Sequence, residues 1–209
     1  MNAFSRNRML KVFLASIGAV VLLLSVLSAI QLSDHSLASA VQIDGWNIIL
    51  VRHGDAPGRS EPTNFNLNDC STQRGLSDKG RYEARDLGAM FRARGINVTR
   101  ILTSRFCRAR ETAQLMKLGT IENAAAFDDL SFNKQRAREL LDGERKLIAS
   151  WHGPGVLLIV SHGSNIKALT GIALEQGAMV VVSQKQGQLV AKPVNFSSAL
   201  VMLNCPGCF

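Results

Sequence analysis

The chain has 209 residues, of which 46% are hydrophobic and 19% charged, so it is long enough for one domain with a buried core but too short for two full-sized domains, and its composition excludes a disordered chain. The formal net charge is +8, but three basic residues lie in the first eleven positions, which leaves 21 basic and 16 acidic residues, or +5, in residues 12–209. This mild surplus fits an anionic membrane face or a phosphorylated substrate, whereas the sparse aromatic residues and the lack of a basic cluster make nucleic acid the weakest partner.

Residues 12–32 contain no charged side chain. Such a run can cross a bilayer as a helix, and the basic residues in 1–11 predict a cytoplasmic amino end with the chain from about residue 41 onward exported. We therefore expect a transmembrane anchor or uncleaved signal at 12–32, a linker at 33–45, and a domain at 46–209 that faces the periplasm from the inner membrane. Cleavage after Ala38-Ser39-Ala40 stays open, which would release the domain.

Alternating apolar and amphipathic segments follow. In chain order, the patterns predict a strand at 46–51, a long loop at 54–76, a helix that Ser77 caps and Gly95 ends, a strand at 100–103, helices at 107–116 and 133–151 with a short strand at 124–127 between them, a strand at 156–160, a helix at 164–172, and strands at 179–182, 189–192 and 199–203. In the first helix, Tyr82 is placed on the apolar face with Ala84, Leu87, Met90 and Phe91. The alternation predicts an α/β fold, a three-layer α/β/α sandwich with a mostly parallel, mixed sheet.

Polar residues cluster where the strands end. Arg52-His53-Gly54 follows the first strand, Ser161-His162-Gly163 follows the strand at 156–160, and the segment 104–113 carries three arginines directly after another strand. Because the carboxyl ends of parallel strands meet at one edge of a sheet, these side chains are expected to share one crevice. Two imidazoles and at least two guanidinium groups form an anion site with a nucleophile, and phosphate is its natural ligand.

These motifs resemble the histidine phosphatase superfamily, whose hallmark is a strand ending in Arg-His-Gly. The resemblance covers about residues 46–205 and includes Leu76–Gly80, Ser104 with Arg108-Ala109, and Val160–Gly163. It implies that His53 becomes phosphorylated, that Arg52, Arg108 and His162 hold the phosphoryl oxygens, and that neither a metal nor a cofactor is needed. Arg105 and Arg110 have no match and are expected to be solvated surface charges.

The chain departs from the family pattern at the general acid. The mutase-like branch places a Glu two residues after a Leu, where this chain has Leu130-Ser131-Phe132. Asp129 is therefore the first candidate for the acid, with Asp128 and Asp55 behind it. Arg59 and Gly163 are the candidate substrate-binding residues, since Arg59 is spaced to reach the anion and Gly163 allows close approach of the backbone.

The resemblance predicts a metal-independent phosphomonoester hydrolase that acts through a phosphohistidine intermediate. Among anchored members of the superfamily, the chain is similar to phosphatases of heptose phosphate in the lipopolysaccharide core, so the expected substrate is a phosphorylated small molecule or an envelope glycolipid. A non-catalytic phosphate-binding or scaffold protein and a protein phosphohistidine phosphatase remain alternatives. A mutase is disfavoured because its Glu is missing.

Four cysteines, Cys70, Cys107, Cys205 and Cys208, form an even set that fits an oxidising space. We hypothesise a bridge between Cys70 in the long loop and Cys107 beside the arginine segment, which would hold this loop over the pocket. Cys205 and Cys208 end the chain without a following helix, so a terminal clip or two free thiols fit them better than a redox or zinc site.

Overall fold

The computed structural model describes residues 46–132, 134–185 and 188–194. The expected membrane segment at 12–32, the linker, the strand at 199–203 and the cysteine pair at 205 and 208 lie outside the described residues. Within the described ranges, none of the helices has the length and apolar character needed to cross a bilayer.

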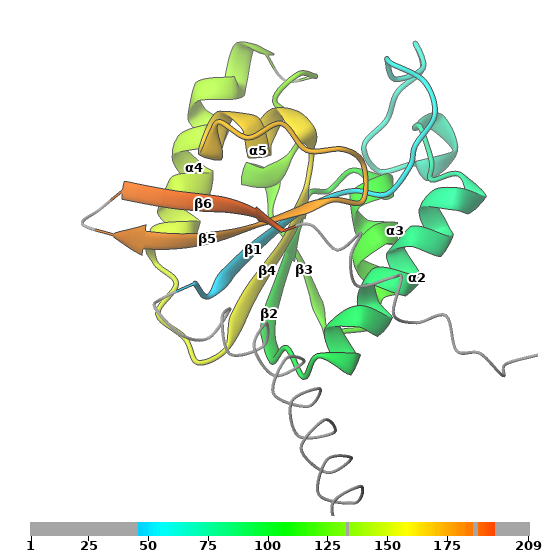
Figure 1. The fold of residues 1–209 in the computed structure, drawn as a ribbon. Helices are drawn as coiled ribbons and strands as arrows, with labels where there is room; N and C mark the ends of the chain where they lie inside the picture. Colours follow the sequence, from blue (N-terminus) through cyan, green and yellow to red (C-terminus); the bar gives the residue numbers. More distant parts are fainter. Residues whose placement is uncertain (1–45, 133, 186–187, 195–209) are drawn as a thin grey trace, which may run out of the picture. The chain divides into compact units, whose positions relative to one another are not determined.

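The described domain is built on a six-stranded mixed sheet with the order β3-β2-β4-β1-β5-β6 (Figure 1). The strands β1 to β4 run parallel to one another, β5 is antiparallel to β1, and β6 is antiparallel to β5. Their bounds are β1 Ile48–Arg52, β2 Val98–Thr103, β3 Ile121–Asn123, β4 Val156–Ser161, β5 Met179–Lys185 and β6 Gln188–Val194. The mixed, mostly parallel sheet predicted from the sequence is thus confirmed.

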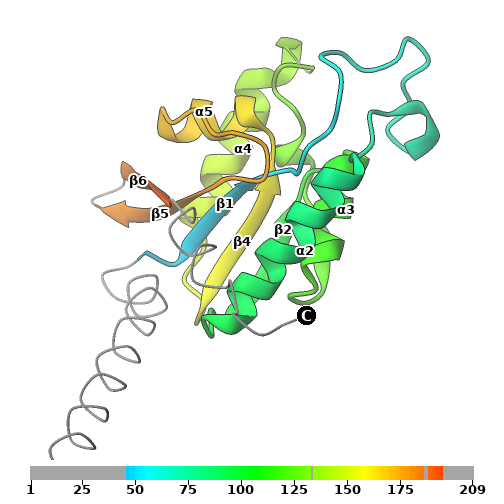
Figure 2. The same cartoon turned by 45° about the vertical axis from the view of Figure 1, so that its right-hand side comes forward.

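Helices cover both faces of the sheet (Figures 1 and 2). One apolar core joins the sheet to α2 (Asp78–Ala93) and α3 (Cys107–Met116), and it includes Phe91 and Met116. A second core joins the opposite face to α4 (Ala137–Ala149) and α5 (Gly163–Thr170), and it includes Ile148 and Ile166. Three short 3-10 turns complete the fold: η1 at Cys70–Thr72, η2 at Ala125–Phe127 and η3 at Lys134–Arg136.

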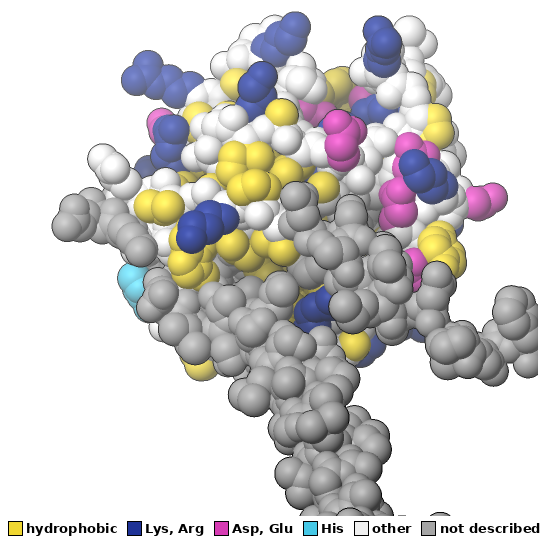
Figure 3. Space-filling model, viewed as in Figure 1, with side chains coloured by type: hydrophobic (Ala, Val, Ile, Leu, Met, Phe, Trp, Pro, Cys, Tyr) yellow, Lys and Arg dark blue, Asp and Glu magenta, His cyan; other side chains and the backbone are white. Residues whose placement is uncertain are grey.

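Some apolar side chains at the rim of the core on the α4 and α5 side are partly exposed. Leu169, Ile172 and Leu189 pack against it while only partly buried. Figure 3 shows apolar side chains gathered on the face that carries α5 and the segment leading to β5. Charged side chains border this area, so the surface is mixed rather than uniformly basic.

Local sequence signals explain the ends of α2 and its contact with α3. The Ser77 hydroxyl accepts a hydrogen bond from the Gly80 amide at 3.1 Å, and Gly95 follows the helix with φ of 60°, as the predicted cap and stop require. A Cβ added at Gly88 would lie 2.0 Å from the Met116 carbonyl oxygen. The two helices therefore approach closely because position 88 has no side chain.

Three sequence predictions need correction. The strand predicted at 124–127 is wrong: the strand is β3, and it pairs Ile121 with Ile101 of β2 before η2 turns the buried Phe127 into the core. Tyr82 is 65% exposed, because it lies two residues, or roughly 200°, away from Ala84 on the buried stripe of α2. The helix predicted at 133–151 begins later, with α4 at residue 137 after η3.

Candidate active site

The carboxyl ends of three parallel strands bring the predicted site residues together. Strand β1 pairs Arg52 with Ser161 of β4, and β2 pairs Thr103 with Val160, so the residues that follow these strands meet at one edge of the sheet. His53 and His162 follow β1 and β4, and their ring centroids lie 5.3 Å apart. Both rings are buried, so the two imidazoles face each other in a site largely screened from water.

His53 is held in one tautomer. Its Nδ1 lies 2.8 Å from the carbonyl oxygen of Gly54, which can only accept, so Nδ1 carries the proton and donates. The lone pair therefore sits on Nε2, which accepts a hydrogen bond of 3.1 Å from Arg108 Nε. Burial, with further help from the positive charges of Arg108 and Arg52, lowers the pKa of His53 to about 3. At neutral pH this imidazole is uncharged and has a free electron pair.

Arg108 is the centre of the site and is fully buried in the first turn of α3. Besides its bond to His53, Nη1 donates to Glu61 Oε1 at 2.8 Å and Nη2 donates to Asp129 Oδ2 at 3.0 Å. Its guanidinium also lies 4.7 Å from the centre of the Phe106 ring. Burial lowers the pKa of Arg108 while Glu61 and Asp129 act to raise it, and an arginine at this position stays cationic.

His162 is connected to both the arginine and β2. Its Nε2 lies 2.8 Å from Ser104 Oγ, and this hydroxyl in turn donates to Asp128 Oδ1 at 3.3 Å. The Ser104 oxygen therefore accepts from His162 Nε2, and His162 Nδ1 accepts from Arg108 Nη2 at 3.2 Å. Burial and the charge of Arg108 lower the pKa of His162 well below its ordinary value. The second imidazole is thus also neutral in the free site.

Arg52 has a donor without a partner. Its Nη1 donates to the Leu174 carbonyl oxygen at 2.6 Å, while its buried Nε has no hydrogen-bond partner in the described part of the chain. A Cβ on Gly163 would lie 3.2 Å from this Nε, so the glycine permits the close packing of the guanidinium. A buried, unsatisfied N–H on a cationic side chain beside two imidazoles is the donor that an incoming oxyanion would satisfy.

Asp129 lies within the site, but the structure gives it the character of an anion. Its Oδ2 contacts Arg108 and lies 3.6 Å from His162 Nδ1, and its Oδ1 accepts from the hydroxyl groups of Ser131 at 2.6 Å and Ser164 at 2.8 Å. Burial acts to raise the pKa of Asp129, but the pKa is held well below its ordinary value, and the hydrogen bonds from Ser131 and Ser164 stabilise the anion. In the free site this carboxylate therefore carries no proton to donate.

The two reserve candidates for the acid are engaged elsewhere. Asp128 holds Arg105, with its Oδ2 2.6 Å from Arg105 Nη2, and Asp55 accepts a hydrogen bond from Ser77 at the start of α2. Arg105 was expected to be a solvated charge, yet its half-exposed side chain is paired because Asp128 lies directly against its backbone and guanidinium. Asp129 is the carboxylate of these three that reaches Arg108.

The long loop supplies two residues that the sequence analysis missed. Glu61 is buried against Arg108 and also accepts from the backbone and Nε of Arg74. Arg74 adds positive charge that contributes to lowering the pKa of both His53 and His162. Arg59, the predicted loop arginine, is exposed, and no hydrogen bond or ion pair joins it to the other described residues of the site. The role predicted for it stays a prediction.

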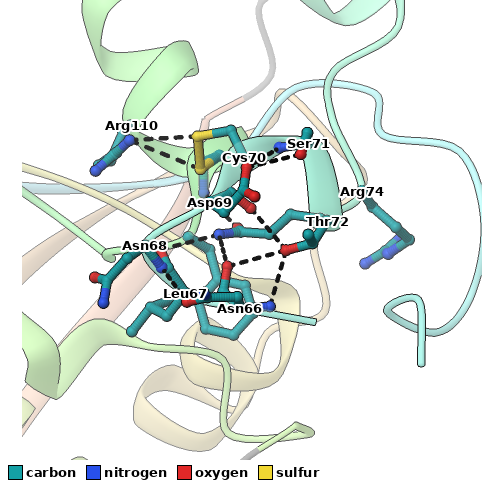
Figure 4. The surroundings of a disulfide bond; sticks show 12 residues. Asn66, Leu67, Asn68, Asp69, Cys70, Ser71, Thr72, Arg74 and Arg110 are labelled. Atoms are coloured by element: carbon teal, nitrogen blue, oxygen red, sulfur yellow. Dashed lines mark hydrogen bonds between the residues drawn. A yellow bond between two sulfur atoms is a disulfide. The ribbon is translucent and has the colours of Figure 1, made fainter. Parts of the chain in front are cut away.

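A disulfide holds this loop against the site. Cys70 of η1 is bonded to Cys107, whose Cα lies 5.6 Å away, which confirms the hypothesised bridge. Figure 4 shows Arg110 of α3 beside both sulfur atoms, with Nη2 3.4 Å from the Cys70 sulfur, so this residue is not the solvated charge expected. Because Cys107 directly precedes Arg108, the bridge fixes the loop next to the central guanidinium.

The arrangement provides a neutral imidazole nucleophile surrounded by cationic donors. An oxyanion beside His53 would meet N–H groups of Arg52 and Arg108, while His53 Nε2 offers its electron pair. No group of three or more His, Cys, Asp or Glu side chains in the described residues is placed to hold a metal ion. The chemistry that these residues can perform is transfer of an oxyanionic group to nitrogen.

The family model of the histidine phosphatase superfamily (branch 1) matches residues 48–134, which include Arg52, His53, Arg108 and Asp129. A search of curated proteins found no match.

Solved structures show the same fold. YhfR from Bacillus stearothermophilus aligns with a TM-score of 0.55 and 16% identity, over 70% of this chain and 95% of that one. The Rv3214 protein of Mycobacterium tuberculosis aligns with a TM-score of 0.52 and 17% identity, over 71% and 95%. Phosphoserine phosphatase from Entamoeba histolytica, in complex with 3-phosphoglyceric acid, aligns with a TM-score of 0.50 and 15% identity, over 72% and 98%. The family model matches residues 48–134 of the chain, and the solved structures, at 15–17% identity, show that the chain shares their fold.

Proposed function

We propose that this protein is a histidine-type phosphatase, which hydrolyses phosphomonoesters through a covalent phosphohistidine at His53. The observation that carries the proposal is the state of this side chain: its Nδ1–H donates to the Gly54 carbonyl, and its Nε2 electron pair points at the Arg108 guanidinium. A bound phosphoryl group would replace the imidazole as the acceptor for Arg108. It would also satisfy the unpartnered Nε of Arg52. The charge on the phosphoryl oxygens is thereby neutralised where it has to be in the transition state.

In the first step the Nε2 electron pair of His53 attacks phosphorus, and the bond from phosphorus to the ester oxygen breaks. A phosphomonoester has its second pKa near 6, so its monoanion brings one proton into the site. The substrate's negative charge competes for Arg108 and so raises the proton affinity of Asp129, which passes this proton to the leaving oxygen. The products are an alcohol and phosphohistidine, whose Nδ1 keeps its proton against Gly54.

In the second step water attacks phosphorus, and the phosphorus–nitrogen bond breaks. The departing electron pair returns to Nε2, so His53 is again neutral. Asp129 accepts a proton from the attacking water and returns it to a phosphate oxygen, which releases inorganic phosphate as the monoanion. Arg52 and Arg108 stay on the phosphoryl oxygens throughout, and their fixed positions lower the barrier of both steps.

A second candidate substrate class is favoured by the ionised state of Asp129. Because this carboxylate lacks a proton in the free site, substrates whose leaving group departs without protonation would react readily. Phosphohistidine in proteins is one such substrate. The two classes differ in how activity depends on the leaving group. An enzyme that acts on alkyl phosphates hydrolyses substrates with poor leaving groups, whereas one restricted to phosphoramidates or aryl phosphates does not.

We also propose that the domain works outside the inner membrane on an envelope-associated phosphate ester, such as a phosphorylated sugar of a glycolipid. The Cys70–Cys107 disulfide supports this placement, because such bonds persist in oxidising compartments. The uncharged run at residues 12–32 would tether the domain beside such a substrate. Protease treatment of intact spheroplasts tests the placement: digestion of the domain without lysis supports it, and protection until lysis contradicts it.

The activity is tested with the purified full chain and 4-nitrophenyl phosphate in a buffer containing a metal chelator. The chain offers a matched pair of variants, since His53 is buried in the site while His152 is exposed beyond α4. His53→Ala should reduce turnover by about three orders of magnitude or more, as loss of a nucleophile does. His152→Ala should behave as wild type. Equal rates for His53→Ala and wild type would reject the proposed function.

A further inference from the structure

We infer that Asn165 and Glu144 form a buried positioning pair that holds the Asp129 carboxylate against Arg108 and His162. The inference rests on the proposed function, in which Asp129 moves a proton between the leaving oxygen, water and phosphate. Asn165 lies in the first turn of α5 and Glu144 in the middle of α4, and neither touches His53 in any contact of the described residues. The pair would therefore act through Asp129 rather than on the substrate.

Asn165 ties the backbone on both sides of Asp129. Its Nδ2 donates to the Asp128 carbonyl oxygen at 2.9 Å, and its Oδ1 accepts from the Leu130 amide at 3.3 Å. The amide thus spans the residue before and the residue after Asp129. Asn165 is fully buried, so water cannot replace these hydrogen bonds at low cost if the side chain is removed.

The side chain of Asp129 is held by Ser164, which directly precedes Asn165 in α5. The Ser164 hydroxyl donates its proton to Asp129 Oδ1 at 2.8 Å. The same carboxylate oxygen accepts from the Ser131 amide at 2.9 Å. With Oδ1 held from two sides, Oδ2 is directed at Arg108 Nη2 and His162 Nδ1. The rotamer of Asp129 is therefore set by Ser131 and Ser164, while Asn165 holds the backbone that carries this carboxylate.

Glu144, on the neighbouring helix α4, fixes the orientation of the Asn165 amide. Its Oε1 accepts from Asn165 Nδ2 at 2.5 Å, and its Oε2 is buried without a hydrogen-bond partner in the described residues. Burial raises the pKa of Glu144 to about 8, so the group is a neutral acid at neutral pH. The charged side chain that acts on it is Arg145 on the same helix, while α5 presents the neutral Asn165. A neutral hydrogen-bond acceptor is therefore what the pair requires at position 144.

This requirement separates two substitutions at the same site. Glu144→Gln keeps an oxygen acceptor of the same shape, whereas Glu144→Leu keeps the volume but leaves Asn165 Nδ2 without that partner. Asn165→Leu removes every hydrogen bond of the amide. With an alkyl phosphate as substrate, Asn165→Leu and Glu144→Leu should lower kcat about tenfold or more, because small misplacements of a proton-transfer group are costly. Glu144→Gln should retain the wild-type kcat at pH 7.

Two readouts distinguish positioning from a structural role. Inhibition by inorganic phosphate should change less than about threefold in all three variants, since Arg52 and His53 still bind the anion. The loss in kcat should be larger for an alkyl phosphate than for 4-nitrophenyl phosphate, whose leaving group needs less protonation. Ile148→Ala, in α4 like Glu144, serves as the control. It should lower the melting temperature and leave kcat of the folded enzyme unchanged.

The outcomes separate this inference from the proposed function. If His53→Ala keeps the wild-type rate, the proposed function fails and the positioning inference fails with it. If His53→Ala is inactive but the Leu variants are folded, as judged by circular dichroism, and keep the wild-type kcat, the positioning inference alone is overturned. Should Asn165→Leu not fold, the comparison of Glu144→Leu with Glu144→Gln decides. Equal kcat values for these two variants, whether both are high or both are low, contradict the inference.

Discussion

Replacing Glu144 by Gln should remove a large part of the pH dependence of stability above neutral pH. The carboxyl group has a pKa of 4.5 when solvated and of about 8 in the fold, because burial disfavours the anion. Folding therefore favours the protonated form, and the stability this gives is fully present below pH 4.5 and is lost as the pH rises to about 8. One pKa unit corresponds to about 1.4 kcal/mol, so the total loss is about 5 kcal/mol.

The window from pH 6.5 to 8.5 isolates this group. The pKa of His53 is lowered to about 3 from 6.5, so its contribution to stability falls only as the pH drops below 6.5, which is the opposite sign and a different range. Between pH 6.5 and 8.5 the free energy of unfolding of wild type should fall by about 2 kcal/mol on account of Glu144, as linkage requires for these two pKa values. Glu144→Gln should show no such fall, since an amide does not titrate.

The assay is denaturant unfolding of the full chain at several pH values, without reductant, so that the disulfide stays intact. The comparison uses the slope of the unfolding free energy against pH rather than its absolute value. The buried amide introduced by Glu144→Gln changes the unfolding free energy by an amount that does not depend on pH. Glu122→Gln is the matched control, since Glu122 is half-exposed and paired with Arg100 on the surface, and it should leave the slope in this window unchanged. Parallel curves for wild type and Glu144→Gln would refute the reasoning.

Three further predictions concern the loop, the site and the helix packing. Cys70→Ser should lower the free energy of unfolding by about 4 kcal/mol, as the chain-entropy model gives for a sequence separation of 37, and reduction of wild type should have the same effect; an unchanged denaturation midpoint would count against it. Gly163→Ala should reduce kcat/KM about tenfold with little change in melting temperature, because its Cβ would displace the Arg52 guanidinium; wild-type kinetics would contradict this. Gly88→Ala should destabilise the fold by about 2 kcal/mol or more, measured by denaturant unfolding, because its Cβ meets the carbonyl of residue 116; Gly75→Ala, which meets nothing within 4 Å, should be neutral in both assays.

The strand ends could be predicted from the sequence because their signals are local. A continuous apolar run followed by Arg52-His53-Gly54 marks both a covered strand and its polar exit, and Ser161-His162-Gly163 repeats the pattern. Once β1 and β4 pair in parallel, the two imidazoles that follow them lie at the same edge of the sheet, so no other contact is needed to predict that they meet. The position of β3 could not be predicted because three residues are too few for a periodic pattern. The neighbouring residues of η2 are more apolar, so the sequence pattern predicts the strand there instead.

The loop and the second layer of the site could not be predicted in this way. Glu61 lies in a segment rich in turn-forming residues, and its position against Arg108 depends on the disulfide and on Arg74, which are contacts across the fold. Asn165 and Glu144 lie 21 residues apart on two helices, and their contact exists only because α4 and α5 pack on the same face of the sheet. On the sequence alone, Asn165 reads as an ordinary polar residue near a helix start.

The most direct measurement is to trap the covalent intermediate. The full chain would be mixed with a ³²P-labelled aryl phosphate, quenched in alkali within milliseconds, digested and mapped. We predict label on the peptide that contains His53, stable in alkali, released by acid as a phosphoramidate is, and absent in His53→Ala. Label on another residue, or wild-type turnover with no label on His53 at any quench time, would contradict the account.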